Sequence, residues 1–215
     1  MGTTIDTEAR RRATDRDFKV IVTRRYNAKV FDGSKIDDER LEKLFDIIRH
    51  APSADNLQPW KIKVIHDKKM LDTLAAATLP FNRERIKTCS HLLVFCADMD
   101  LESHWRLLES KLRQAGYPEE VIEHMGTVAR MIMGRTLDER LNRSQWDVFL
   151  AVGNAVNGAE SLGIDSSLIG GFNAKEYARI LALQDNLVPT LLVALGKAAD
   201  KPLPKVRFSQ DEVFF

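Results

Sequence analysis

Residues 51–60 leave this chain few ways to fold, because a segment with a clear periodicity stands on each side of them. Before the loop, residues 38–50 carry apolar side chains at three- and four-residue spacing, which predicts an amphipathic helix. After it, residues 61–66 alternate and then become β-branched, which predicts a strand. The loop is rich in proline, small residues and amides, so it is anchored at both ends and can present backbone amides to a flat, polar ligand.

The remaining periodicities predict further helices and strands around this loop. Residues 91–97 are continuously apolar, which predicts a strand buried on both faces. A long apolar helix is expected from Trp146 to Leu162, and its small residues let another helix approach closely. Other helices are predicted at 18–23, 70–77 and 174–183, a turn at 80–82, and other strands at 166–169 and 190–195.

Length and charge limit the class of protein. The 215 residues are enough for one domain with a substantial core. With 32 basic and 31 acidic residues the formal net charge is +1, so nothing indicates the broad basic field of a general nucleic-acid-binding protein. Neither a long apolar segment nor a charged-then-apolar leader is present, so we expect no membrane span, no secretion signal and a cytoplasmic location.

Two segments stand apart from the predicted core. Residues 1–17 carry many charges without apolar periodicity, so we expect a flexible N-terminal segment ahead of a single domain at 18–215. Residues 101–145 have helical propensity, are rich in Arg, Glu and Met, and are interrupted at 116–118. We expect residues 101–145 to form a helical excursion that acts as a lid.

Several kinds of chemistry lack their usual residue patterns in this chain. The five histidines have no zinc-ligand spacing, and neither HExxH nor paired CxxC is present, so we expect no metal site. The glycine patterns of serine hydrolases, P-loop NTPases and Rossmann dinucleotide-binding folds are also missing. Cys89 and Cys96 flank an apolar run, and we expect both to be reduced, structural thiols.

Five segments, in the same order along the chain, carry a family resemblance. The loop Pro52-Ser53-Ala54-Asp55-Asn56-Leu57-Gln58-Pro59-Trp60 is similar to the PSS-x-N-x-QPW motif of the FMN-dependent nitroreductases, especially the oxygen-insensitive NAD(P)H nitroreductase and dihydropteridine reductase branch. The other four segments are Arg25–Asp32, Phe81–Arg85, Ile169–Phe172 and Leu203–Arg207. Together they cover the chain from about residue 18 to its end, which makes the resemblance specific.

The resemblance implies an α+β fold in which helices wrap a mainly antiparallel central sheet. It also implies a homodimer with FMN sites at the interface, since the helix at 146–162 lies at the centre of the family's dimer contact. The C-terminal segment 206–215 is expected to extend over the partner subunit. A small aromatic electron acceptor is the implied substrate.

FMN needs cations around its phosphate and polar donors along its ring edge. By resemblance, the phosphate group of residues comprises Arg25, Lys29, Lys205 and Arg207, and Tyr26 and Asn27 belong to the same cofactor-binding turn. The residues assigned to the flavin ring are Asn82, Arg85, Ile169, Gly170 and Gly171. Those assigned to the flavin from the second subunit are Pro52, Ser53, Ala54 and Asn56, with Asp55 at the substrate opening.

Three positions depart from the family pattern. Asp55 stands where a small hydroxyl residue is often found, Arg85 where Lys is usual, and Gly170 where Glu is common. Arg85 keeps the positive charge but adds fixed planar donors, and the carboxylate of Asp55 is expected to disfavour acidic substrates. The residues alone also allow simpler interpretations, namely a turn at 52–60, a helix cap at Asn82 and a glycine turn after a strand.

The resemblance implies an NAD(P)H-dependent oxidoreductase that reduces nitroaromatics or quinones by ping-pong hydride transfer through tightly bound FMN. No protein side chain is assigned as a catalytic nucleophile, acid or base, because the cofactor performs the redox chemistry. Two alternatives remain open. One is a flavin or dihydropteridine reductase on the same fold, and the other is a flavin-binding protein without turnover.

Overall fold

The computed structural model describes residues 15–215, and the flexibility expected for residues 1–17 falls outside the described part of the chain except at 15–17, which begin helix α2. The helices are α2 (Asp15–Arg24), α3 (Asp38–Arg49), α4 (Lys68–Ala76), α5 (Arg83–Thr88), α6 (Leu101–Gln114), α7 (Glu119–Met133), α8 (Leu137–Ser161), α9 (Ala174–Ile180) and α10 (Gln210–Val213). Two short 3-10 turns are η1 (Ala54–Asn56) and η2 (Pro80–Asn82). The strands are β1 (Trp60–Ile65), β2 (His91–Asp98), β3 (Asp165–Ile169) and β4 (Leu187–Gly196).

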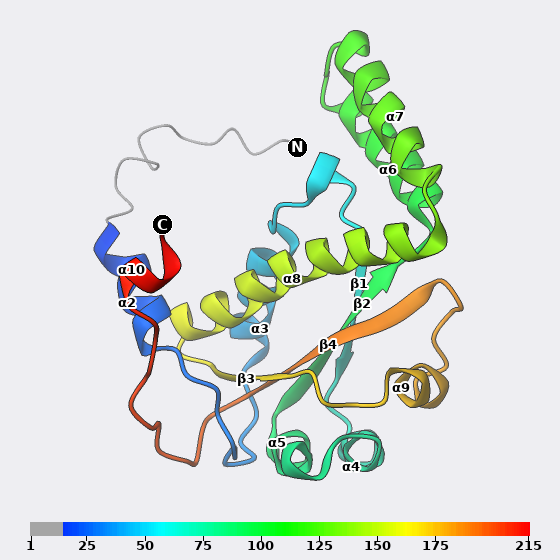
Figure 1. Ribbon diagram of the computed structural model, residues 1–215. Coiled ribbons are helices and arrows are strands. Elements are labelled where there is room, and N and C mark those ends of the chain that lie inside the picture. Colours follow the sequence, from blue (N-terminus) through cyan, green and yellow to red (C-terminus); the bar gives the residue numbers. More distant parts are fainter. Residues whose placement is uncertain (1–14) are drawn as a thin grey trace.

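The described strands form one sheet in the order β1-β2-β4-β3, and each neighbouring pair is antiparallel (Figure 1). β2 lies inside the sheet, and all its residues are buried, which explains its continuous apolar sequence. The predicted α+β fold with a mainly antiparallel central sheet wrapped by helices is confirmed.

Alternation along the inner strands gives the sheet two apolar faces. On one face, Leu93 and Phe95 of β2 pack with α3 and α8. On the other, Leu92 and Val94 pack with α4, α5 and α9. Figure 1 shows these two groups of helices on opposite sides of the sheet. The predicted elements at 38–50, 61–66 and 91–97 agree with the structure to within one or two residues.

Helix α8 begins nine residues earlier than the sequence analysis placed it, at Leu137 rather than Trp146. A capping box starts it, because the Thr136 side chain accepts from the backbone of Glu139 and the Glu139 carboxylate accepts from the backbone of Thr136. The last part of the 101–145 segment therefore belongs to the long central helix. Sequence reasoning missed the T-x-x-E pattern of Thr136 and Glu139, which is typical of a helix N-terminus.

The excursion itself is the hairpin of α6 and α7, which projects from the body (Figure 1). It has its own apolar cluster, in which Trp105, Leu108 and Ile122 are buried together with Leu57 from the loop before β1. The role of this hairpin as a lid stays a prediction. Within residues 15–215, no helix combines the length and the apolar character that crossing a bilayer requires.

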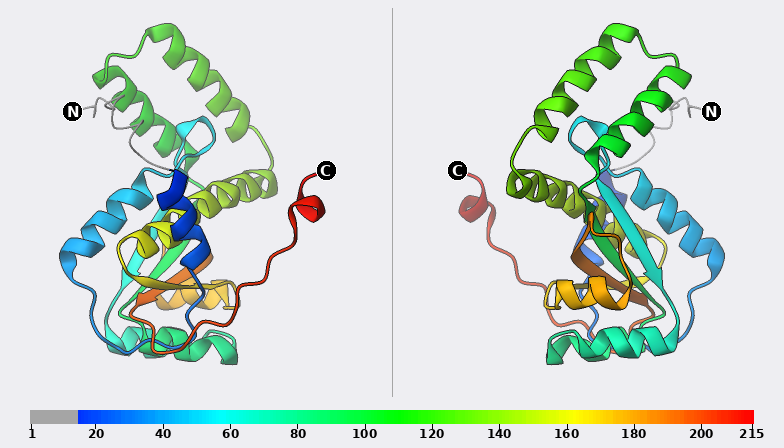
Figure 2. Two further views of the ribbon diagram at one scale, coloured as in Figure 1. Left: turned by 90° about the vertical axis from the view of Figure 1, so that its left-hand side faces the viewer. Right: turned by 90° about the vertical axis from the view of Figure 1, so that its right-hand side faces the viewer.

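The C-terminal segment leaves the body after β4. Figure 2 shows it leading away from the rest of the chain to the short helix α10. Its apolar side chains are exposed, including Phe208 and Phe214. Such a segment suits contact with another chain, and its predicted exchange in a dimer stays a prediction.

Candidate functional site

Two segments far apart in the sequence enclose a cavity of about 420 Å3 at one end of α2. One wall is residues 23–27, at the end of the helix, and the other is residues 202–207 of the C-terminal segment. The cavity lining includes predicted cofactor-binding residues from both segments: Arg25, Tyr26, Asn27, Lys205 and Arg207. The structure therefore brings together residues that the sequence separates by almost the whole chain.

Lys205 ties the C-terminal segment to α2. Its ammonium donates to the backbone carbonyl of Val22 at 2.9 Å and also to that of Arg25, which satisfies carbonyls at the helix C-terminus. Desolvation lowers the pKa of Lys205, and the neighbouring charges of Arg25 and Arg207 lower it further. Three cations thus repel one another around one cavity, an arrangement that an anion such as a phosphate would relieve.

Lys29, predicted for the same phosphate, does not line this cavity, and its side chain is exposed. Its backbone N–H instead donates to the Asp200 carboxylate at 3.0 Å. Tyr26 donates its hydroxyl to the backbone carbonyl of Asp200 at 3.2 Å. Burial, followed by the charges of Asp200, Asp165 and Glu160, raises the pKa of Tyr26 to about 12, so the phenol stays neutral. Asp200 therefore organises the basic turn.

Asn27 joins the basic turn to the edge strand of the sheet. Its Oδ1 accepts from the backbone N–H of Leu168 at 2.5 Å, and the same turn bridges to Ser166 of β3. β3 then runs through the buried Ile169 into Gly170 and the half-buried Gly171. The contact thus fixes the predicted glycine loop relative to the basic turn.

Asn82 lies beside the glycine loop, as the resemblance implied. Its Nδ2 is 3.4 Å from the Gly171 carbonyl oxygen, and its side chain is buried. Asn82 also occupies the N-cap position of α5, as the simpler interpretation expected, but its side chain makes no capping hydrogen bond there. Neither glycine has a left-handed backbone, and a Cβ at Gly171 would lie 2.9 Å from Asn82 Nδ2. Gly171 is therefore needed for space rather than for a turn.

Arg85 and Ser167 present polar atoms without partners. The Nε of Arg85 and the Oγ of Ser167 are both buried and make no hydrogen bond in the described residues. Burial lowers the pKa of Arg85, and the charge of Asp200 opposes that shift. Because buried polar groups are normally paired, each of these atoms could serve a polar ligand, as could the Nε atoms of Arg140 and Arg143, which are also buried without partners in the described residues.

The loop at 51–60 is held against α8. The backbone N–H of Ala54 donates to the buried carboxylate of Asp147 at 2.9 Å, and Ser53 Oγ accepts from the backbone of Gln58 at 2.9 Å. Asp55 and Asn56 are both left-handed, with φ of 54° and 55°. Such backbone is costly for residues other than glycine, and it concentrates at functional sites.

The carboxylate of Asp55 is already paired. Arg143 of α8 donates to it at 2.9 Å, and both side chains are about a quarter to a third exposed. This ion pair neutralises the charge from which we expected rejection of acidic substrates. The expectation therefore loses its physical basis, because the opening would present a paired rather than a free carboxylate.

Within one chain the two groups of predicted residues stay apart. η1 lies beside the α6–α7 hairpin (Figure 1). The cavity instead lies between the end of α2 and the C-terminal segment. No hydrogen bond or shared cavity joins residues 52–56 to residues 23–27 in the described structure. This separation agrees with a site completed by a second subunit.

Three residues that shape the site were missed by sequence reasoning. Asp200 organises the basic turn, while Asp147 and Arg143 hold the loop. The spacing of Arg143 and Asp147 by four residues on a helix was visible, but nothing local indicated which loop they contact. Their partners lie about 90 to 170 positions away.

Other chemistry finds little support in the described residues. Within residues 15–215 no group of three His, Cys, Asp or Glu side chains is arranged to hold a metal ion. Cys89 and Cys96 are free and buried, and burial raises the pKa of each thiol to about 12. Such thiols are poor nucleophiles at neutral pH, which agrees with a structural role.

Comparison with known proteins gives consistent matches along the chain. The family model "Nitroreductase family" matches residues 22–197. An oxygen-insensitive NADPH nitroreductase of Helicobacter pylori is 28% identical over 194 residues, which cover 88% of this chain and 91% of that protein. An oxygen-insensitive NAD(P)H nitroreductase of Enterobacter cloacae is 29% identical over 189 residues, covering 82% and 86%. A solved structure of a protein from Exiguobacterium sibiricum, in complex with FMN, has a TM-score of 0.83 and 26% identity, covering 94% of this chain and 96% of that one.

The fold and these matches thus define an α+β oxidoreductase. The chain belongs to the Nitroreductase family, as its motifs predicted. The roles of individual site residues stay predictions, and they enter the proposal that follows.

Proposed function

We propose that this chain is an FMN-dependent NAD(P)H oxidoreductase that reduces nitroaromatics or quinones in a ping-pong cycle. The observation that carries the proposal is the cavity where Arg25, Lys205 and Arg207 converge. A dianionic phosphate suits such a site because charge-assisted hydrogen bonds are stronger than neutral ones. The names of the Helicobacter and Enterobacter relatives support the activity, and the FMN complex of the Exiguobacterium protein supports the cofactor.

The protein's part in this function is binding and orientation. Bound FMN would supply the hydride chemistry, accepting from NAD(P)H and donating to the electron-poor acceptor. Arg25, Lys205 and Arg207 would hold the phosphate, while Arg85 would provide positive charge beside the ring. The backbone at Gly171 and the amide of Asn82, which already lie together, would contact the ring edge. No side chain of this chain needs to act as a nucleophile.

The site requires a second subunit in this proposal. The loop at 52–56 would reach the flavin from the partner, since it does not approach the cation cavity of its own chain. Helix α8 offers the contact surface, because Trp146 is 68% exposed and Phe149 and Leu150 are about half exposed on one side of it. A Cβ at Gly153, one turn further on, would meet no atom within 4 Å. Close approach by another helix is therefore unobstructed there.

The decisive experiment is an absorbance spectrum of the purified protein under anaerobic conditions. A flavin band that bleaches with NADH or NADPH and recovers with a nitroaromatic or quinone is the expected result. Recovery with free FMN or a dihydropteridine instead would favour those reductases. Bound flavin that neither nicotinamide reduces would indicate a flavin-binding protein, and failure to take up FMN would refute the proposal.

A further inference from the structure

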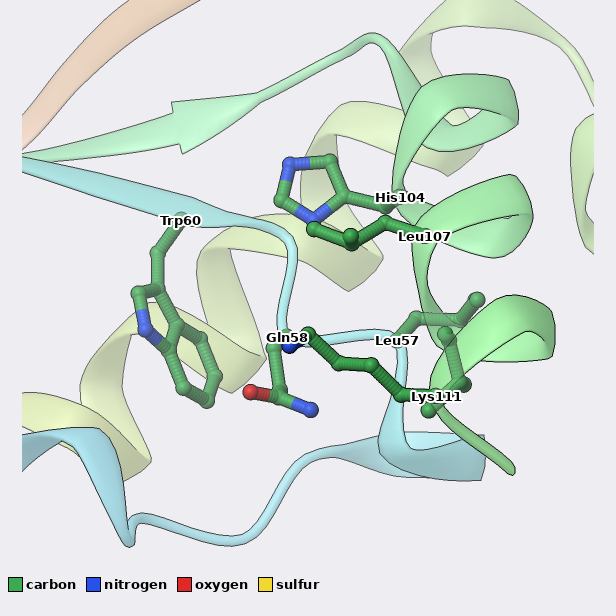
Figure 3. A pocket seen from close by; sticks show the side chains of 7 residues that line it. Leu57, Gln58, Trp60, His104, Leu107 and Lys111 are labelled. Carbon is green, nitrogen blue, oxygen red and sulfur yellow. The ribbon is translucent and has the colours of Figure 1, made fainter. Parts of the chain in front are cut away.

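A second cavity, of about 180 Å3, lies between the loop before β1 and helix α6 (Figure 3). It shares no lining residue with the cation cavity. Its apolar walls are the indole of Trp60 and the side chains of Leu57, Leu107 and Leu108. Because an apolar cavity of about 150 Å3 accommodates benzene, this one has room for a single six-membered ring with a small substituent.

His104 contributes a free hydrogen-bond acceptor to this cavity. Its Nε2 is 2.9 Å from the buried carboxylate of Asp98, which also accepts from Asn186 Nδ2 at 2.6 Å and from the backbone of Asp100 at 3.0 Å. Burial of Asp98 acts to raise its pKa, but these hydrogen bonds together outweigh that effect and hold the pKa below its usual value. Because Nε2 donates its hydrogen to this carboxylate, Nδ1 is the ring nitrogen left to accept from a ligand. Figure 3 shows the His104 ring at the edge of the cavity beside Leu107.

Gln58 contributes a second free acceptor. Its amide nitrogen donates to the backbone oxygen and to the side-chain Oδ1 of Asn56, at 3.1 and 3.0 Å. Both bonds use the nitrogen, so the orientation of the amide is fixed and Oε1 remains without a protein partner in the described residues. The side chain lies between Trp60 and Lys111 in Figure 3.

Lys111 supplies the positive charge. Its side chain extends from α6 toward Gln58 (Figure 3). The neighbouring charges of α6, Glu109 and Arg113, pair with each other at 2.9 Å. Lys111 has no ion pair or hydrogen bond through its ammonium in residues 15–215, so it is available to a ligand.

We propose that this cavity binds a small aromatic carboxylate that carries a hydroxyl or amino group. The ring would lie against Trp60 between the leucines, and the carboxylate would meet Lys111. The hydroxyl or amino hydrogen would donate to Gln58 Oε1 or His104 Nδ1, which no protein group occupies. A neutral hydrocarbon would leave all three polar groups unused, and a larger ligand would exceed the volume.

A bound ligand would also steady the loop at 52–56, because Leu57 and Gln58 continue it directly. That consequence rests on the proposed function, whereas the binding itself does not. The test therefore measures binding alone.

The test is calorimetric titration of the purified, flavin-saturated protein with 4-hydroxybenzoate, compared with benzoate and phenol. We expect one saturable site per chain for 4-hydroxybenzoate and weaker binding of both analogues. Lys111→Met should weaken 4-hydroxybenzoate binding about tenfold, because a charge-assisted contact is lost. Leu107→Glu, at the 58% exposed rim, should weaken it through charge repulsion without disturbing the core. Lys69→Met, an exposed lysine on α4, is the matched control and should leave the affinity unchanged.

Three results would overturn the inference. The first is no heat of binding. The second is an affinity that is equal in the parent, Lys111→Met and Leu107→Glu proteins. The third is binding that shifts the visible flavin spectrum and ignores both substitutions, which would place the ligand at the flavin instead.

Discussion

Gly171→Ala tests whether the glycine loop and Asn82 form one cofactor-binding unit. A Cβ at this position would lie 2.6 Å from Leu79 Cδ1 and 2.9 Å from Asn82 Nδ2. Ordinary contacts between such atoms begin near about 3.5 Å, so both neighbours must move. Leu79 is 47% exposed and can rotate away, but Asn82 is 3% exposed and cannot. The substitution therefore displaces the buried amide.

The expected cost follows from that geometry. Overpacking a buried site costs about 1–3 kcal/mol, and the mobility of Leu79 places Gly171→Ala in the lower part, about 1–2 kcal/mol. For a domain of this size the melting temperature should fall by about 2–8 °C. The affinity for FMN, measured by flavin fluorescence titration, should fall as well, because Asn82 is predicted to contact the ring.

Gly170→Ala provides the matched control in the adjacent residue. Its nearest neighbour would be Leu191 Cδ1 at 3.7 Å, an ordinary contact, and its backbone is not left-handed. The melting temperature should stay the same or rise slightly, since alanine reduces the entropy of the unfolded chain. Equal melting temperatures for the two variants would refute the packing argument. A destabilised Gly171→Ala protein with unchanged FMN affinity would refute the site assignment.

Three further predictions concern the phosphate, the dimer and pH. Arg207→Gln should lower FMN affinity about 10- to 100-fold, because the Arg207 guanidinium bonds only to the Val206 carbonyl in the described structure and is available to the phosphate. Lys201→Gln is the control, and equal FMN affinities of the two variants would contradict the assignment. Gly153→Arg should give a folded monomer, measured by light scattering, that binds FMN weakly in a flavin titration, because the new side chain would project from the open face of α8. A stable dimer would argue against the α8 interface. Burial raises the pKa of Asp147, so the folded state binds this proton more tightly than the unfolded state, and stability falls as the pH rises above about 4. Asp147→Asn keeps an acceptor for the backbone N–H of Ala54 and should flatten the dependence of the melting temperature on pH. An unchanged pH dependence would contradict this.

Much of the fold was predictable because its signals are local. Helix α3 and strand β2 follow from periodicity within a dozen residues, and the loop between α3 and β1 follows from its prolines and small residues. The start of α8 was predictable too, from Thr136 and Glu139, although apolar periodicity placed it at Trp146. Local patterns therefore fixed the elements better than their ends.

The candidate site was predictable only through the family motifs. Their spacing does not predict a contact between Arg25 and Lys205, since they lie 180 positions apart. Lys29 matched the motif as well as Arg25 did, yet its side chain is exposed and does not line the cavity that Arg25 lines. A motif specifies residue types at positions, whereas the direction of each side chain depends on the packing around it.

The sequence by itself determined the family through its five motifs, and the α+β class through that resemblance. It also determined the loop that links α3 to β1, because hydrophobic periodicity and turn chemistry act over a few residues. The tertiary structure alone decided that Asp147 holds Ala54, that Arg143 neutralises Asp55 and that Gly171 must lack a side chain beside Asn82. These contacts join residues about 90 positions apart. Only the packing of the whole chain brings such groups together, and no local pattern records which distant partner each one meets.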